Sequence, residues 1–336
     1  MAIRVAINGF GRIGRMVLRA AYESGRSDIE VVAINDLADL ETNAFLLRHD
    51  STHGAFPGTV SVNDGNLDLG RGAIRCFNER DPAKLPWKDL DIDVALECSG
   101  VFTQRDDAAK HISAGARKVI VSAPAKGADI TIVMGVNEDK LTPEHDVISN
   151  ASCTTNCLAP VVKVMNDALG VERGYMTTVH AFTGDQRLVD TMHKDMRRAR
   201  AAADNIIPTT TGAAKAVGLV IPELDGKLDG TAIRVPTVNV SLIDFKFDAG
   251  RATDADEVKA ALRKAADGPM KGVLGISEEP LVSSDFNHNP NSSTVDIHET
   301  QVIDKTLVRV MSWYDNEWGF SSRMCDAAAA VGKLVK

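Results

Sequence analysis

The sequence lacks the segments that mark membrane-spanning and disulfide-rich proteins. No apolar run reaches the roughly 18 residues that a spanning helix needs. Residues 1–7 are strand-like and lack the longer apolar core of a signal peptide. The five cysteines are scattered and odd in number, which is a poor framework for disulfides. We therefore expect a cytoplasmic protein with reduced thiols and no membrane partner.

An excess of positive charge is missing as well. The formal net charge is −8, so the field around the molecule repels nucleic acid and anionic lipid. With 336 residues, of which 44% are hydrophobic and 25% charged, the chain has an ordinary globular composition and enough length for two domains. Composition thus disfavours nucleic acid as a principal partner.

Apolar patterning divides the chain into two parts near residue 150. In the first, short apolar strands alternate with helical patterns, which is typical of a Rossmann-type parallel sheet. These strands are expected at 3–7, 30–34, 93–96, 118–121 and 130–133. In the second, longer segments rich in Thr and Val favour an α+β domain with a mostly antiparallel sheet. They are 173–182, 233–247 and 306–313. We predict an α/β protein with domains at 1–151 and 152–316, and a helix after Ser321.

A glycine-rich turn follows the first expected strand and opens a helix. Gly9, Gly11 and Gly14 form the pattern GxGxxG. The first glycine permits a tight turn, the second lets the backbone approach a pyrophosphate, and the third allows close packing of helix on strand. Asp36, at the end of the next strand, is placed to bind ribose hydroxyls and to repel a 2′-phosphate. The sequence therefore predicts NAD as the cofactor, with a purely structural turn as the alternative.

Cys153 stands at or just before the N-terminus of an expected helix. Unpaired N–H groups at that end favour a thiolate, the reactive form of cysteine. His180 ends a strand, and a histidine beside such a thiol would form an ion pair with it and shuttle protons. Cys153 is a candidate nucleophile and His180 its base, with a buried structural thiol as the alternative. No second ligand pair accompanies Cys153 and Cys157, so no metal site is predicted. Pro160 should bend the helix.

Basic and hydroxyl side chains gather between residues 183 and 212. Three of the basic residues are interpreted as a solvated helix face: Lys194, Arg197 and Arg200. Thr211 and Gly212 differ, because a hydroxyl and a backbone N–H together can cradle a phosphate. Arg234 is charged within a strand that is otherwise apolar or neutral. A phosphate bound by two guanidinium N–H groups would satisfy it.

Three motifs resemble those of phosphorylating glyceraldehyde-3-phosphate dehydrogenases. They are NGFGRIGR at 8–15, SCTTNC at 152–157 and WYDNEWG at 313–319. The likeness runs from about residue 2 to the C-terminal helix. It implies the fold of that family, NAD as cofactor and a homotetramer. It also implies that the C-terminal helix, about 317–336, packs back on the NAD-binding domain.

The resemblance implies roles for individual residues as well. Cys153 would be the nucleophile and His180 its base. Positions that match cofactor contacts are Gly9, Gly11, Arg12, Ile13, Gly14, Asp36, Arg80, Ser122 and Asn316, the last holding the nicotinamide carboxamide. Positions that match the sites for the substrate phosphate and for inorganic phosphate are Ser152, Thr154, Thr183, Arg198, Thr211, Gly212 and Arg234.

The implied reaction oxidises D-glyceraldehyde 3-phosphate, with inorganic phosphate, to 1,3-bisphosphoglycerate through a thioester on Cys153. It would serve glycolysis or gluconeogenesis. A dehydrogenase that acts on erythrose 4-phosphate and releases a free acid is a close alternative, because it would share the cysteine and the histidine. The stretch 182–186 and the pair of Thr211 and Gly212 favour the phosphorylating enzyme. Reduction of aspartyl or glutamyl phosphates and non-enzymatic binding of nucleic acid are more distant alternatives.

Two positions bear on the choice between NAD and NADP. Thr191 and Met192 stand where family members strict for NAD commonly have Leu-Pro, and Phe320 stands where they commonly have Tyr. The first difference leaves some use of NADP open, whereas Asp36 still favours NAD.

NAD should support a higher rate than NADP at equal concentration, by about ten-fold or more, because the Asp36 carboxylate repels the 2′-phosphate. Initial rates with each cofactor measure this. An Asp36→Ala variant should narrow the gap. Comparable rates with the unchanged protein would show that Asp36 does not decide the cofactor.

Overall fold

The computed structural model describes residues 2–335, which form two compact units. The first contains the residues up to Met134, Glu138–Ala151 and the residues from Ser321 onward. The second contains Gly135–Asn137 and Ser152–Phe320. The first unit is therefore assembled from separate pieces of chain.

Across residues 2–335, no helix combines the length and the apolar character needed to cross a membrane.

A nine-stranded sheet forms the centre of the first unit, in the order β3-β4-β5-β2-β1-β6-β7-β9-β8. Its strands are β1 (Ile3–Asn8), β2 (Ile29–Asn35), β3 (Ser61–Asn63), β4 (Asn66–Asp68), β5 (Ala73–Phe77), β6 (Val94–Glu97), β7 (Lys118–Val121), β8 (Ile130–Thr131) and β9 (Val147–Ser149). The ribbon β3-β4-β5 pairs antiparallel, and the other neighbours pair in parallel. The predicted Rossmann-type sheet is confirmed.

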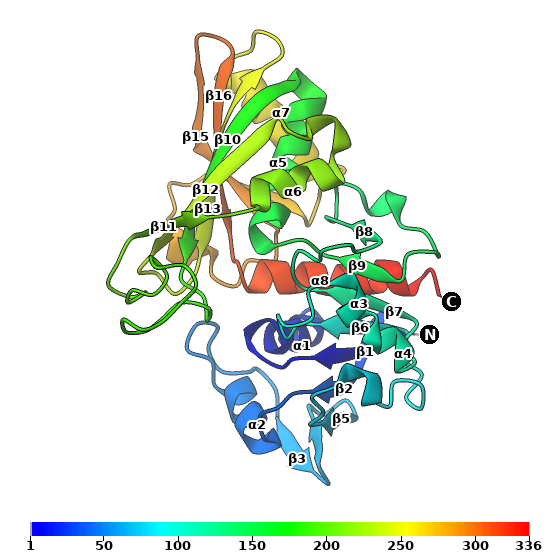
Figure 1. Ribbon diagram of the computed structural model, residues 1–336. Coiled ribbons are helices and arrows are strands. Elements are labelled where there is room, and N and C mark those ends of the chain that lie inside the picture. Colours follow the sequence, from blue (N-terminus) through cyan, green and yellow to red (C-terminus); the bar gives the residue numbers. More distant parts are fainter. Residues whose placement is uncertain (1, 336) are drawn as a thin grey trace. The chain divides into compact units, whose positions relative to one another are not determined.

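Helices of the first unit pack on strands that are apolar on both faces. They are α1 (Arg12–Glu23), α2 (Leu40–Arg48), α3 (Arg105–Ala108), α4 (Lys110–Ser113) and most of α8 (Trp318–Gly332). Val5, Ile7 and Val94 of the central strands are fully buried, as strands covered on both sides require. Helix α1 buries Met16 and Val17 and lies beside β1 and β2 (Figure 1). The helical spacing in the sequence reflects this buried face.

The strand order marks where a ligand can bind in this unit. β1 pairs with β2 on one side and with β6 on the other, so the direction of the chain along the sheet reverses beside β1. In open parallel sheets a crevice forms at such a point, outside the carboxyl ends of the strands. Gly9 and Asp36 directly follow the ends of β1 and β2.

The glycine turn between β1 and α1 is sterically closed at two of its glycines and open at the third. Gly9 has φ +88°, and a Cβ added there would lie 2.5 Å from the Cα of Ser99. A Cβ on Gly14 would lie 2.1 Å from the carbonyl oxygen of Gly9. A Cβ on Gly11 would meet no atom within 4 Å. The space beside Gly11 is thus available to a ligand.

The second unit contains a seven-stranded sheet in the order β11-β12-β10-β13-β16-β15-β14. Its strands are β10 (Val171–Ala181), β11 (Ile207–Thr210), β12 (Leu228–Val235), β13 (Ser241–Ala249), β14 (Leu274–Ser277), β15 (Ser293–Ile303) and β16 (Leu307–Tyr314). The pairs β10–β12 and β14–β15 are parallel and the others antiparallel, so the mostly antiparallel sheet is confirmed. Figure 1 shows the helices on one side of it: α5 (Cys153–Leu169), α6 (Ala213–Val220) and α7 (Ala255–Asp267).

One predicted strand was wrong. The segment 233–247 was expected to be continuous, but β12 ends at Val235 and β13 begins at Ser241. Pro236 lies in the gap and has no N–H for a sheet hydrogen bond. The N–H of Thr237 donates to the carbonyl of Val235 at 2.7 Å, and this turn ends the strand.

Four short 3-10 helices are described in addition: η1 (Pro82–Lys84), η2 (Glu138–Lys140), η3 (Pro222–Leu224) and η4 (Ser283–Phe286).

Two alanine variants should separate the steric role of the turn from its contact with a ligand. Gly14→Ala is expected to lower the thermal midpoint by several degrees, because its Cβ would overlap the Gly9 carbonyl oxygen. Gly11→Ala should leave the midpoint nearly unchanged and weaken NAD binding. Thermal unfolding and calorimetric titration with NAD measure both effects. Equal losses of stability would contradict the assignment.

Candidate active site

Cys153 is the first residue of helix α5. Ser152 caps the helix, and its Oγ accepts a hydrogen bond from the N–H of Thr155 at 3.1 Å. This cap satisfies one of the N–H groups that a helix start leaves unpaired. Cys153 is half-buried, and its thiol stands at the positive end of the helix dipole. Helix α5 continues through Pro160 to Leu169, and the bend expected at Pro160 stays a prediction.

Strand β10 carries His180 to the Cys153 thiol. The Nε2 atom of His180 lies 3.6 Å from Sγ of Cys153. On the other side of the ring, Nδ1 lies 2.7 Å from the carbonyl oxygen of Ala181. Because a carbonyl oxygen only accepts, Nδ1 must carry the ring proton and Nε2 presents its lone pair to the sulfur. In this tautomer His180 can accept the thiol proton.

Burial opposes a charge on either group alone. Protein packed around the sulfur raises the pKa of the Cys153 thiol, although the positive charge of Arg234 acts against this shift. Burial, together with the charge of Arg234, lowers the pKa of His180 to about 3. Both shifts favour the neutral pair over the ion pair expected from the sequence. A proton transfer within the pair would create both charges together, so that each offsets part of the other's desolvation.

A chain of buried hydroxyls joins the start of α5 to the neighbouring strands. The Thr178 hydroxyl donates to the carbonyl of Leu242 at 3.0 Å and so accepts from Tyr314, whose Oη is 2.9 Å away. Oη of Tyr314 in turn accepts from Oγ1 of Thr154 at 2.8 Å. The Thr154 hydroxyl, predicted to bind an anion, is thus buried and committed to Tyr314. The Tyr314 ring also meets the His180 ring edge-on.

Arg234 lies beside His180, because β12 pairs with β10 with these two residues in register. Nη1 of Arg234 donates to Oγ1 of Thr183 at 2.8 Å and lies 3.4 Å from Oε1 of Gln186. Among the described residues, Nε of Arg234 and Nε2 of Gln186 are buried without a hydrogen-bond partner. Two buried donors that lack acceptors, next to a hydroxyl, form a donor set that a phosphate would complete.

Arg198 lies in an irregular segment and shares Asp185 with Thr183 as a hydrogen-bond acceptor. Lys194, Arg197 and Arg200 are exposed, as predicted, but the helix predicted to carry them was wrong, because residues 187–206 contain no helix. Arg198 donates to Oδ2 of Asp185 at 2.8 Å and to Oγ1 of Thr209 at 3.0 Å. This segment is therefore fixed by hydrogen bonds to a carboxylate and a hydroxyl, and not by the backbone hydrogen bonds of a helix.

Thr211 and Gly212 stand at the start of α6. Gly212 is its N-cap residue, and the N–H of Ala213 donates to the Thr211 hydroxyl at 3.2 Å. Thr211 is half-buried and Gly212 exposed. The predicted combination of a hydroxyl and a helix-terminal backbone is therefore present, at the end of the chain segment that carries Arg198.

Asn316 is held by its side-chain oxygen. Oγ of Ser241 accepts from the N–H of Ala181 at 3.0 Å and donates to Oδ1 of Asn316 at 2.7 Å. Ser241 and Asn316 are both buried. Because the amide oxygen faces a donor, the amide nitrogen of Asn316 is turned the other way and is presented as a donor.

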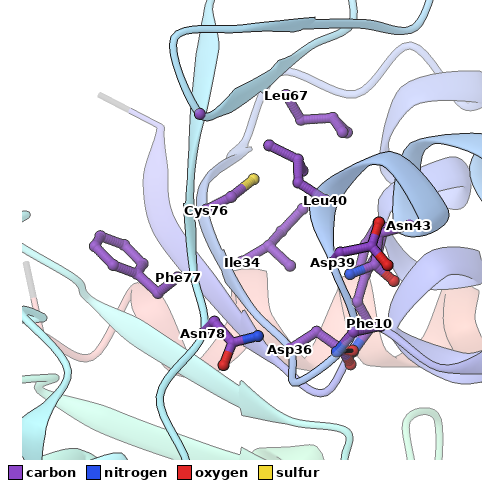
Figure 2. A pocket seen from close by; sticks show the side chains of 12 residues that line it. Phe10, Ile34, Asp36, Asp39, Leu40, Asn43, Leu67, Cys76, Phe77 and Asn78 are labelled. Carbon is purple, nitrogen blue, oxygen red and sulfur yellow. Dashed lines mark hydrogen bonds between the residues drawn. The ribbon is translucent and has the colours of Figure 1, made fainter.

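A cavity of about 210 Å³ lies beside the end of β2 in the first unit (Figure 2). Ile34, Leu40 and Cys76 contribute apolar wall, whereas Asp36 and Asn78 contribute polar groups. One Asp36 oxygen accepts from the N–H of Phe10 at 2.6 Å, which ties it to the glycine turn. An apolar slot beside a carboxylate and an open glycine backbone fits the nucleoside and pyrophosphate of a dinucleotide.

The remaining predicted cofactor residues of the first unit have distinct surroundings. Arg12 forms an ion pair with Asp50, with Nη2 of Arg12 3.3 Å from Oδ1 of Asp50. Ile13 is half-buried and Arg80 is exposed. The N–H of Ser122 donates to the carbonyl of Glu97 at 2.9 Å. Their contacts with NAD stay predictions.

A dinucleotide-type sheet and an α+β unit with a paired cysteine and histidine define the class of NAD-dependent oxidoreductases. Two family profiles match the chain: the NAD binding domain of glyceraldehyde 3-phosphate dehydrogenase over residues 3–105 and its C-terminal domain over residues 152–316. The chain belongs to the glyceraldehyde-3-phosphate dehydrogenase family.

Full-length relatives agree with the profiles. The chain is 66% identical to glyceraldehyde-3-phosphate dehydrogenase of Xanthobacter flavus over 99% of this chain and 100% of that protein. It is 61% identical to that of Cereibacter sphaeroides over 100% of both chains. It is 58% identical to glyceraldehyde-3-phosphate dehydrogenase 1 of Bacillus subtilis over 99% of both.

Several residues that organise the site were not found from the sequence. Ser241 acts through a partner far away in the chain, and no local spacing identifies it. Gln186 lies in the stretch 182–186 that was compared with the family, but its contact with Arg234 joins residues distant in the sequence. Tyr314 lies within the motif 313–319, so the resemblance could have found it. Asp185, which accepts from the hydroxyl of Thr183 and from Arg198, lies in the stretch 182–186 that was compared with the family.

His180→Asn should slow alkylation of Cys153 by iodoacetamide at pH 7 by about ten-fold or more. With the base removed, a thiol whose pKa is raised by burial must lose its proton to solvent, so the rate should recover as the pH rises. The alkylation rate of Cys153 is obtained by subtracting the rate of the Cys153→Ser variant, which reports the other cysteines. His298→Asn, on an exposed position, should react like the unchanged protein. An unaltered rate in His180→Asn would contradict its assignment as the base.

Proposed function

We propose that the protein catalyses the reversible, NAD-dependent oxidative phosphorylation of D-glyceraldehyde 3-phosphate to 1,3-bisphosphoglycerate. The observation that supports this most is the 3.6 Å approach of the lone pair on His180 Nε2 to the Cys153 sulfur. Aldehyde oxidation by a thiol needs a base that takes the thiol proton and is then ready to return it. Membership in the family supplies the choice of aldehyde.

In the first half of the reaction Cys153 becomes an acylated thiol. His180 takes the thiol proton, and the sulfur adds to the aldehyde carbon to form a thiohemiacetal. The backbone N–H of Cys153, together with protonated His180, stabilises the negative charge that develops on the carbonyl oxygen. The glycine turn and Asp36 would hold NAD, which would supply the acceptor for the hydride of the former aldehyde carbon. Loss of this hydride, with collapse of the C–O⁻ bond to a carbonyl, leaves a thioester on Cys153.

In the second half inorganic phosphate releases the acyl group. A phosphate oxygen attacks the thioester carbon, the C–S bond breaks, and Cys153 leaves as a thiolate that His180 can reprotonate. The reaction therefore needs two anion positions, one for the phosphate of the substrate and one for the attacking phosphate. We assign Arg234 and Thr183 to the former, supported by the unpartnered Nε of Arg234. Contacts to one or both anions are assigned to Ser152, Thr154, Arg198, Thr211 and Gly212.

The two compact units correspond in this proposal to an NAD-binding domain, which includes the C-terminal helix, and a catalytic domain. NAD would be held by the glycine turn, Arg12, Ile13, Asp36, Arg80 and Ser122, with Asn316 directed at the nicotinamide carboxamide. Ser241 orients the Asn316 amide so that its nitrogen is available as a donor, and this donor suits the oxygen of the nicotinamide carboxamide. We further propose a cytoplasmic homotetramer, as the family resemblance implies.

Cys153→Ser should abolish phosphate-dependent production of NADH, with a loss of about 10³-fold or more, because a hydroxyl is a far weaker nucleophile than a thiolate. NAD binding should be unchanged. The assay follows NADH absorbance with glyceraldehyde 3-phosphate and with erythrose 4-phosphate, each with and without inorganic phosphate. A preference for erythrose 4-phosphate without phosphate would favour the alternative dehydrogenase. Turnover of Cys153→Ser at the rate of the unchanged protein would end the proposal.

A further inference from the structure

A buried carboxylate lies beneath the glycine turn of the first unit. Glu97 is the last residue of β6, is 1% exposed, and pairs in register with Asn8, the last residue of β1. Both strands end where the order of the sheet reverses. A buried carboxylate is costly unless donors surround it, so each of its contacts is informative.

Both oxygens of Glu97 are fully engaged as acceptors. Oε1 accepts from the backbone N–H of Ser99 at 2.8 Å and from the Ser99 hydroxyl. That hydroxyl accepts from the N–H of Val101 at 3.1 Å, which leaves its own proton for Glu97. Oε2 accepts from Nδ2 of Asn8 and from His111, whose Nε2 lies 3.0 Å away. Four donors converge on one side chain, and none of its lone pairs has to face an apolar wall.

The donor on His111 is fixed by a tryptophan. Nε1 of Trp87 lies 3.0 Å from Nδ1 of His111, and an indole N–H can only donate. Nδ1 must therefore be an acceptor, so the ring proton is on Nε2 and points at Glu97. Trp87 and His111 are both fully buried. No other tautomer of His111 satisfies both neighbours.

The network continues to the ends of the other strands. Oδ1 of Asn8 accepts from Nδ2 of Asn35 at 2.7 Å. The Asn35 side chain exchanges two hydrogen bonds, each 2.8 Å, with the main chain of Glu79. Three members immediately precede predicted NAD contacts in the sequence: Asn8 precedes Gly9, Asn35 precedes Asp36, and Glu79 precedes Arg80. A fourth contact, Ser122, donates its N–H to the carbonyl of Glu97.

We infer that Glu97, oriented by the Trp87–His111 pair, is the positioning residue that sets the backbone of the NAD-binding edge. It holds Asn8 and Ser99 on either side of Gly9, whose missing Cβ would lie 2.5 Å from the Ser99 backbone. The open face of the turn thus depends on a carboxylate that does not itself contact the cofactor. The inference rests on the proposed placement of NAD against Gly9 and Asp36.

Two isosteric amides at opposite ends of one strand test this role. Glu97→Gln replaces an acceptor by a donor and should raise the Kd for NAD by about ten-fold or more. Asp93→Asn is the matched control. Asp93 is also buried, directly precedes β6, and binds the N–H of Arg4 at 2.9 Å and Arg117 at 3.1 Å. It should lower the thermal midpoint and leave the Kd for NAD unchanged.

The measurements are calorimetric Kd for NAD, thermal midpoint without cofactor, KM for each substrate and the alkylation rate of Cys153. Glu97→Gln should raise KM for NAD while KM for the aldehyde and the alkylation rate stay constant. A folded Glu97→Gln variant with an unaltered Kd overturns the inference. An equal rise in Kd for Asp93→Asn also overturns it, because the effect would then follow from lost stability alone.

Milder variants decide the matter if Glu97→Gln does not fold. Ser99→Ala removes one donor at an exposed position, and Trp87→Phe releases His111 to the other tautomer, which would point a lone pair at Glu97. Each should raise the Kd for NAD by about two- to five-fold. Their double variant should fall short of the product of the single effects, because both act through one carboxylate. An unaltered Kd in both single variants overturns the inference.

Asp36→Ala distinguishes failure of this inference from failure of the proposed cofactor placement. If Asp36→Ala binds NAD as tightly as the unchanged protein, the placement itself is wrong. If Asp36→Ala binds weakly while Glu97→Gln does not, only the positioning role of Glu97 is wrong.

Discussion

The approach of one sulfur to one imidazole nitrogen is the constraint on which the rest of the second unit depends. Helix α5 must begin at Cys153 and β10 must end near His180 for these atoms to lie 3.6 Å apart. The Ser152 cap fixes the first point. The Ala181 carbonyl fixes the second by holding the ring proton on Nδ1. Neither atom can turn away without leaving a buried polar group unpaired.

In both units, buried polar side chains lie directly behind the residues proposed to contact substrate or cofactor. Tyr314 and two threonine hydroxyls lie behind Cys153 and His180. Glu97, His111 and Asn8 lie behind the glycine turn. Fully satisfied networks of this kind restrict side chains to one arrangement because every alternative leaves a buried donor or acceptor without a partner. The exposed backbone that would meet substrate or cofactor is thereby held before either arrives.

Local patterns in the sequence were sufficient to predict the secondary-structure elements that carry the site. They were insufficient to predict the contacts that hold the site residues in place. The Gly9 turn, the strand before it and the start of a helix near Cys153 follow from spacing alone, because each depends on neighbours in the chain. The break at Pro236 inside a Val- and Thr-rich run was missed, although proline there gave a local signal. The neutral state of His180 and the contact of Ser241 with Asn316 depend on burial and on residues distant in sequence. Neither burial nor a distant partner leaves a local pattern in the sequence.

The discontinuity of the first unit also constrains how the chain is made. Helix α8 supplies Asp326, which pairs with Arg26 at 3.0 Å, and Cys325, whose thiol donates to the carbonyl of Val17. Gly332 near its end leaves no room for a Cβ against Ile3. A growing chain on the ribosome therefore cannot complete its first unit until residues from Ser321 onward emerge, and the second unit is synthesised before them. Completion of the first unit therefore has to wait for synthesis of the second.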